Sequence, residues 1–188
     1  MSGAWEGFAA ELSARIDRAF LELDQALVAE AALAERRPAP DAWSLAEIAE
    51  HVVRTDHHLL LLAGKLARKA RERAAREDAS VPRSAPGRAF TELERLAQHD
   101  FRWAAPEHML PRGELDLAAA RRVLRADRER GRAILASMPP GAGVLASARF
   151  SPLDLRFDAY QFLALVAAHA ERHARQARRG RGALEGHR

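Results

Sequence analysis

His169 and His173 stand four residues apart, the spacing at which a helix presents two imidazoles to one metal ion. Such residues lie one helical turn apart, about 6 Å along the axis, on the same face. They continue a mostly apolar series at steps of three and four that also contains Phe162, Val166 and Gln176. Burying polar side chains on such a face is costly unless something satisfies them. Two interpretations stay open at this point: a metal site, or histidines hydrogen-bonded within the core or half-exposed at its edge.

A third metal ligand would have to come from another helix, and His51 is the candidate. It precedes Val52, which lies on the apolar stripe of a second predicted helix, so its side chain can point into the interior. His58 lies about 10 Å further along that helix, too far to share an ion with His51. His57 and His58 are expected on the polar flank of this helix. The remaining histidines are expected at the surface: His99, His108 and His187.

The composition limits the kinds of site that the chain can build. It has 188 residues, 48% hydrophobic and 30% charged, which is typical of a globular domain. There is no cysteine, which excludes disulfides, iron–sulfur clusters, zinc fingers and a cysteine nucleophile. Any metal site must therefore use His, Asp or Glu. No apolar stretch reaches the ~20 residues needed to cross a bilayer, and the N-terminus does not read as a signal peptide. We expect a cytoplasmic protein.

The charge pattern does not predict a nucleic-acid-binding protein. The formal net charge is +4, from 30 basic and 26 acidic residues. Much of the basic excess lies in residues 65–76 and 172–188. The first segment is expected at the C-terminal end of a helix, where the helix dipole favours cations. The second is expected to run into a tail, where cations are solvated. Because there is also no helix-turn-helix signature, no nucleic-acid partner is expected.

Apolar residues at helical spacing predict four long amphipathic helices. They cover residues 4–35, 45–76, 117–138 and 159–179. Ser44 and Glu47 form the sequence pattern of a capping box at the start of the second helix. The expected fold is an all-α four-helix bundle with a long crossover connection between helices 2 and 3. Residues 1–180 are expected to form one domain and residues 181–188 a basic tail.

The two long connections, residues 78–113 and 139–157, are expected to line the mouth of any site between the helices. Residues 89–99 could form a short helix in the first of them, and no alternation is long enough to predict a sheet. Trp5 and Phe8 could contribute to a homodimer contact. Ordinary core packing is the alternative that we favour for them.

Three segments carry a more specific signal. Residues 43–51 read W-S-L-A-E-I-A-E-H, residues 150–153 read F-S-P-L, and residues 158–176 contain D-A-Y-Q-F followed by H-A-E-R-H-A-R-Q. In this order, they resemble the W-S-x-x-E-I-x-x-H and F-x-P-L…Q-W/F…H-x-x-R-H-x-x-Q signatures of the DinB/YfiT-like family of bacterial metal-binding bundles. Phe162 stands where tryptophan is common in that family.

The resemblance implies an up-down-down-up bundle in which His51, His169 and His173 bind a divalent metal ion. Three neutral imidazoles leave coordination positions open, as in catalytic rather than structural sites. Zinc or nickel would suit such a site, and iron or manganese could also fit.

Other polar residues near these histidines could support the site. Gln176 could donate to a bound water or ligand. Arg172 and Glu171 could contact the ligands or a bound molecule, or they could lie on a solvated face of the helix. Glu47 and Glu50 could orient His51, although the capping box already explains Glu47.

The family includes metal-dependent enzymes that transfer low-molecular-weight thiols of the mycothiol or bacillithiol type to electrophiles. It also includes a thiol-dependent maleylpyruvate isomerase branch and members without a known reaction. The resemblance therefore implies a small-molecule substrate and, first, a metal-dependent thiol S-transferase, with a metal-dependent hydrolase as the nearest rival. A non-catalytic, stress-associated bundle that binds a metal or a small ligand is the alternative, because no general base has a clear position. The sequence leaves open whether the protein is an enzyme.

Overall fold

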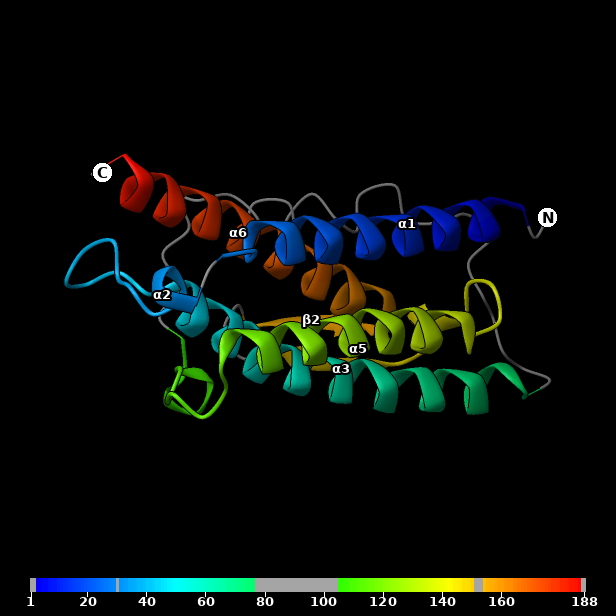
Figure 1. Cartoon of the computed structure of the whole chain (residues 1–188). Helices are drawn as coiled ribbons and strands as arrows, with labels where there is room; N and C mark the ends of the chain where they lie inside the picture. The colour runs from blue at the N-terminus through cyan, green and yellow to red at the C-terminus, as the bar shows by residue number, and fades with distance from the viewer. Residues whose placement is uncertain (1–2, 30, 77–104, 151–153, 187–188) are drawn as a thin grey trace.

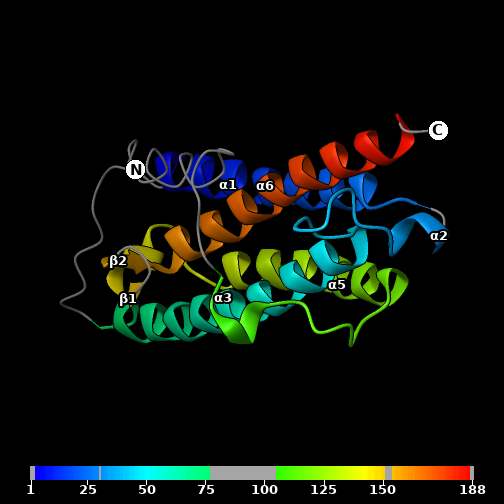
Figure 2. The same ribbon diagram turned by 90° about the vertical axis from the view of Figure 1, so that its left-hand side faces the viewer.

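The computed structural model of the chain describes residues 3–29, 31–76, 105–150 and 154–186. Its elements are, in chain order, α1 (Gly3–Ala26), α2 (Ala31–Ala34), α3 (Leu45–Ala74), the 3-10 turn η1 (Glu107–Met109), α5 (Leu117–Ala136), the 3-10 turn η2 (Ala142–Leu145), β1 (Ser147–Phe150), β2 (Leu155–Asp158) and α6 (Ala159–Glu185). The long helices α1, α3, α5 and α6 lie side by side in both views (Figures 1 and 2). The predicted all-α four-helix bundle is confirmed.

Ion pairs between α1 and α6 show that these two helices run in the same direction. Arg15 of α1 pairs with Glu171 of α6, with 2.9 Å between Nε and Oε1. Seven residues later in each helix, Glu22 pairs with Arg178 at 3.3 Å. Residue numbers therefore rise together along this interface.

The helices α3 and α5 form a second parallel pair. Leu60 of α3 lies against Gly131 of α5. One turn further along both helices, Ile134 of α5 lies against Gly64 of α3. Figure 1 shows this pair running opposite to α1 and α6. The order is therefore up-down-down-up, and a crossover connection must join α3 to α5.

Side-chain caps fix where three of the helices begin. Ser44 and Glu47 form the predicted capping box of α3. Asp116 caps α5 by accepting a hydrogen bond from the Ala119 N–H at 2.6 Å. At α6, Asp158 and Gln161 form a second capping box that the sequence analysis did not identify. The helix that carries His169 and His173 therefore has a defined start.

Two helix ends differ from the predicted ones by more than two residues. The first predicted helix, residues 4–35, ends at Ala26, and the short α2 follows. The last helix continues past Gly180, where it was expected to stop, and ends at Glu185. A glycine inside a helix costs only about 1 kcal/mol, which the surrounding helix can tolerate. The short helix predicted at residues 89–99 lies outside the described residues.

A two-stranded hairpin lies at one end of the bundle, although the sequence predicted no sheet. β1 and β2 pair antiparallel, with Ser147 opposite Asp158 and Phe150 opposite Leu155. Each strand has four residues, too few to give an alternation that stands out in the sequence. Phe150 stacks on Phe157 at a centroid distance of 5.1 Å, so the hairpin is anchored by aromatic packing.

The core lies along α6, whose residues from Phe162 to Ala168 are all buried. Trp5 and Phe8 of α1 are also buried and pack on Tyr160, with ring centroids 5.7 and 5.2 Å away. They therefore take part in core packing within the chain, the alternative that we favoured. Within the described ranges, no helix combines the length and the apolarity that crossing a membrane requires.

Candidate metal centre

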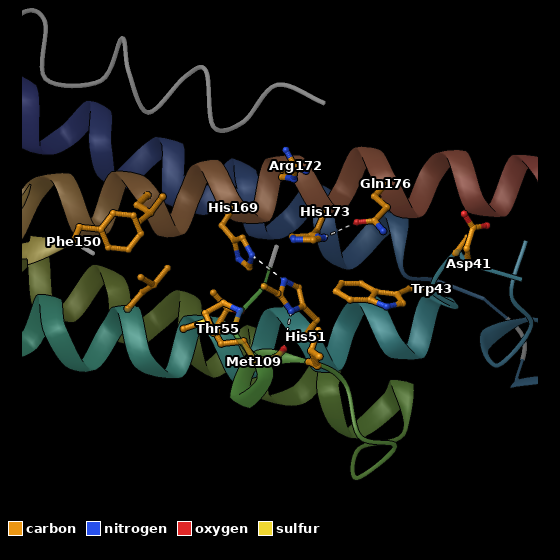
Figure 3. Close-up of a pocket in the computed structure, with 16 residues that line it drawn as sticks. Asp41, Trp43, His51, Thr55, Met109, Phe150, His169, Arg172, His173 and Gln176 are labelled. Atoms are coloured by element: carbon orange, nitrogen blue, oxygen red, sulfur yellow. Dashed lines mark hydrogen bonds between the residues drawn. The ribbon is translucent and has the colours of Figure 1, made fainter. Parts of the chain in front are cut away.

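The bundle brings His51 of α3 together with His169 and His173 of α6 (Figure 3). One ring nitrogen from each histidine lies within 4.8 Å of the others. His51 and His173 are each 5% exposed, and His169 is half-buried. Within the described ranges, no other group of three or more His, Asp or Glu side chains is close enough to share an ion. The predicted juxtaposition of these three side chains is therefore present.

Each of the three imidazoles uses Nδ1 for a hydrogen bond. His51 donates from Nδ1 to the carbonyl oxygen of Met109 at 2.8 Å. His173 donates to Oε1 of Gln176 at 2.8 Å. Nδ1 of His169 lies 3.3 Å from a carboxyl oxygen of Asp56, within hydrogen-bond distance. The Nε2 atoms are thereby left for a ligand, and those of His51 and His169 are 3.4 Å apart.

The environment keeps all three histidines neutral. Burial, reinforced by His169 and Arg172, lowers the pKa of His51 to about 3. Burial, reinforced by Arg172, lowers the pKa of His169 to about 3. Burial and the other two histidines hold the pKa of His173 well below its ordinary value. The neutral imidazole is the form that binds a metal ion, so the cluster has its ligands ready at neutral pH.

Asp56 is the important residue that the sequence analysis missed. It is fully buried, and burial raises the pKa of its carboxyl group well above the ordinary value. Its Oδ2 has no hydrogen-bond partner among the described residues. A carboxyl group bonded to Nδ1 of a histidine whose Nε2 faces an ion is a recurrent arrangement in zinc proteins. The residues present therefore fit a divalent metal ion. The signal available in the sequence was that Asp56 is an acidic residue next to Thr55, which lies on the apolar stripe of the second helix.

A second polar contact network holds the loop that supplies the Met109 carbonyl group. Glu50 is 1% exposed, and its carboxylate accepts hydrogen bonds from the backbone N–H groups of Arg112, Gly113 and Glu114 at 3.0, 2.8 and 3.2 Å. Glu50 thus acts on His51 indirectly, by fixing the loop after η1. It does not orient the imidazole by direct contact, as the sequence had suggested.

The other predicted supporting residues have different surroundings. Glu47 is occupied by the capping box and by an ion pair with Arg37, and it does not line the cavity beside the histidines. Glu171 pairs with Arg15 and joins α6 to α1. Gln176 contacts the cluster through its Oε1, which accepts a hydrogen bond from Nδ1 of His173. Arg172 lines the cavity.

The remaining histidines stay apart from the cluster where they are described. His57 and His108 are exposed, and His58 is half-buried with its ring 5.0 Å from that of His108. His99 and His187 lie outside the described residues.

A cavity of about 350 Å³ opens beside the three histidines. Trp43 forms part of its wall, with its ring centroid 4.8 Å from that of His51. Phe150 of the hairpin forms the opposite end, as Figure 3 shows. The remaining lining residues include the apolar side chains of Leu59, Ala105, Pro106, Met109, Leu110 and Leu165. Both connections thus contribute to the site, as expected, and the cluster faces a mostly apolar space of small-molecule size.

A further carboxyl group is buried on α5. Asp127 is 7% exposed, and its Oδ2 has no hydrogen-bond partner among the described residues. Burial and the neighbouring Asp56 raise the pKa of Asp127 to about 7, against smaller opposing effects of Arg130 and His57. Asp127 is therefore protonated in the folded chain at pH values where it is ionised in the unfolded chain.

We expect Asp56→Asn to weaken zinc binding by roughly tenfold or more, because the loss of a partner that orients a metal ligand typically has this effect. Competition with a chromophoric chelator measures the affinity. Glu171→Gln is the matched control, since it removes a nearby carboxylate that pairs with Arg15 rather than with a histidine. Equal zinc affinities of the Asp56→Asn variant and the wild type would contradict the role given to Asp56.

We expect Asp127→Asn to stabilise the metal-free protein at pH 8 but not at pH 4. The folded pKa of about 7 lies above the ordinary value of 3.8, so the wild type loses stability as the pH rises through this window. Asparagine does not titrate, and the gain at pH 8 should be roughly 2–4 kcal/mol. Urea unfolding of both proteins from pH 4 to 8 measures it. A stability difference that does not change with pH would show that Asp127 has an ordinary pKa.

The comparisons with known proteins agree with this geometry. The family model of the DinB superfamily matches residues 11–177, a range that contains all three histidines and most of the bundle. No curated protein and no solved structure gave a significant match. Because the family model covers most of the sequence, the chain belongs to the DinB superfamily.

Proposed function

We propose that this protein binds one divalent metal ion through Nε2 of His51, His169 and His173 and acts as an enzyme on a small molecule in the adjacent cavity. The observation that carries the proposal is the pattern of hydrogen bonds. All three Nδ1 atoms are taken by Met109, Asp56 and Gln176, which leaves three neutral Nε2 atoms at the cavity.

A bound ion would supply a Lewis acid with open coordination positions, able to lower the pKa of a thiol or a water molecule. Zinc or nickel suits the imidazole ligands best, and iron or manganese also accepts them. The chain's own residues would bind and orient the substrate. Trp43 and Phe150 give the cavity aromatic walls, and Thr55 also lines it. The buried Thr55 hydroxyl group has no hydrogen-bond partner among the described residues.

The reaction that we propose first is transfer of a low-molecular-weight thiol to a small electrophile. A hydrolase gains from a base that accepts a proton from the attacking water. The carboxylate that lines the cavity in the described part of the chain is Asp41, which is exposed and lies beyond Trp43 and Gln176 in Figure 3. A thiol, whose ordinary pKa is about 8.5 against about 15.7 for water, is ionised by a bound ion more readily than water is and depends less on such a base. The site therefore favours thiol transfer over hydrolysis.

Among the described residues no base lies at the cluster, which favours a second candidate, a non-catalytic metal- or ligand-binding bundle associated with stress. In that case the ion would mainly hold α3 against α6. Metal content and turnover, measured separately, distinguish the two candidates.

We expect the purified protein to contain about one divalent ion per chain, and His169→Ala/His173→Ala to contain none, because a single imidazole cannot hold the ion. Inductively coupled plasma mass spectrometry measures this. His57→Ala/His58→Ala is the matched control, since it removes two histidines of α3 that do not line the cavity. An ion that persists in the first variant, or a wild type that cannot be loaded, would contradict the metal site.

We expect the metal-loaded protein to accelerate the reaction of a low-molecular-weight thiol with monobromobimane or chlorodinitrobenzene. Bacillithiol, mycothiol and glutathione form the thiol panel, and loss of the electrophile is followed by fluorescence or absorbance. His169→Ala/His173→Ala should reduce the rate to the uncatalysed background. One bound ion without turnover for any thiol would exclude the transferase and support the non-catalytic bundle.

A further inference from the structure

The cavity beside the histidines has two distinct ends, because α3 and α6 run in opposite directions along it. Leu59 follows His51 by about two turns on α3, and Leu165 precedes His169 by about one turn on α6. Both leucines line the cavity, and both directions lead toward Phe150 of the hairpin, which Figure 3 shows at this end. We call the end lined by Leu59, Phe150 and Leu165 the hairpin end.

The charged residues that line the cavity lie toward its opposite end. Trp43 precedes α3 and Gln176 comes after the histidines of α6, so both lead away from the hairpin. Asp41 lies beyond them in Figure 3. Arg172 follows His169 on α6, on the side away from the hairpin. Among the described residues, the hairpin end therefore has no charged lining side chain.

The hairpin end offers hydrocarbon surface to a bound molecule. Its leucines and Phe150 are buried side chains packed into the bundle. Thr55 lies between His51 and Leu59 along α3 and also lines the cavity, but its hydroxyl oxygen is buried. A polar group placed at this end would give up its hydrogen bonds to water without replacement, whereas an apolar group would gain from leaving water.

We propose that the hairpin end binds an apolar group of the electrophile and that the thiol reaches the histidines from the opposite end. This inference rests on the proposed function and names its substrate class: electrophiles whose reactive carbon lies at the histidines and whose uncharged hydrocarbon group extends toward Phe150. The candidate thiols carry several hydroxyl, amide or carboxylate groups, which are costly to bury at an apolar end.

The test compares two unreactive analogues that differ by one hydroxyl group, N-butylacetamide and N-(4-hydroxybutyl)acetamide. Each competes with the neutral probe N-phenyl-1-naphthylamine, whose fluorescence rises in an apolar site. We expect N-butylacetamide to displace the probe from the wild-type protein at a concentration at least about tenfold lower, because the added hydroxyl group would be buried without a hydrogen bond. This preference should persist after treatment with a chelator. Equal displacement by the two analogues, or no binding of the probe, would overturn the proposal.

Variants assign the preference to the hairpin end. Leu59→Gln should reduce it to less than about threefold, because the new amide can pair with the added hydroxyl group, whereas Leu59→Met keeps an apolar side chain and should retain it. The matched control is Leu61→Gln, since Leu61 is an exposed residue of α3 that does not line the cavity. An equal loss with Leu61→Gln would overturn the assignment.

A second variant covers the case in which thermal unfolding shows that Leu59→Gln does not fold. Leu165→Phe narrows the same end with another apolar side chain, and it should weaken the binding of N-butylacetamide by at least about threefold. Unchanged binding in a folded Leu165→Phe variant would overturn the assignment.

The reactive counterparts connect the hairpin end to turnover. In N-butyl-2-chloroacetamide and N-(4-hydroxybutyl)-2-chloroacetamide, the thiolate sulfur forms a bond to the chlorine-bearing carbon, chloride leaves with the electron pair, and the thiol proton passes to solvent. We expect the metal-loaded protein to act on the butyl compound with a kcat/KM at least about tenfold higher. The thiol should not displace N-phenyl-1-naphthylamine, and displacement would overturn the assignment of this end to the electrophile.

The outcome is separable from that of the proposed function. Turnover with equal kcat/KM for the two chloroacetamides would overturn only the hairpin end as the electrophile's binding site. A binding preference for N-butylacetamide without turnover would contradict thiol transfer and would still support an apolar ligand at this end.

Discussion

Burying an imidazole between packed helices is unfavourable unless its nitrogen atoms find partners, and the interface of α3 and α6 buries three of them close together. The surrounding structure supplies a different acceptor for each. A loop presents the Met109 carbonyl group to His51, α3 presents the Asp56 carboxyl group to His169, and α6 presents Gln176 to His173. Much of the rest of the site follows from this requirement, including the anchoring of the loop by Glu50.

The parts of the site that lie on one periodic element could be predicted from the sequence. The spacing of His169 and His173 on an apolar face was sufficient to bring them together. The position of His51 beside the apolar stripe of α3 made it the candidate third ligand, and the resemblance to a known family supported that choice. Asp56 was missed because the apolar stripe of α3 defines the buried face of the helix only broadly and does not show which neighbouring residues are buried. Whether a residue beside Thr55 points toward α6 or toward solvent depends on the rotation of the helix within the bundle. Met109 was beyond the reach of the sequence, since its role is played by a backbone carbonyl group.

The helix boundaries show the same limit. The cap at Ser44 has a local side-chain signature and was found, whereas the end of α6 was placed too early because Gly180 reads locally as a stop. Packing along the helix overrode this local preference. The hairpin was missed for a related reason: its strands are short, and the aromatic contact between Phe150 and Phe157 that anchors it joins two strands rather than residues of one periodic element.

The ligands of the cluster are far apart along the chain, since His51 and His169 are separated by 118 positions. An ion bound to both would act as a reversible cross-link that exists in the folded state and not in the unfolded one. Its contribution to stability would then grow with the concentration of free ion, reaching about 4 kcal/mol at a thousand times the dissociation constant. The melting temperature of this protein would thus report the metal supply of its surroundings.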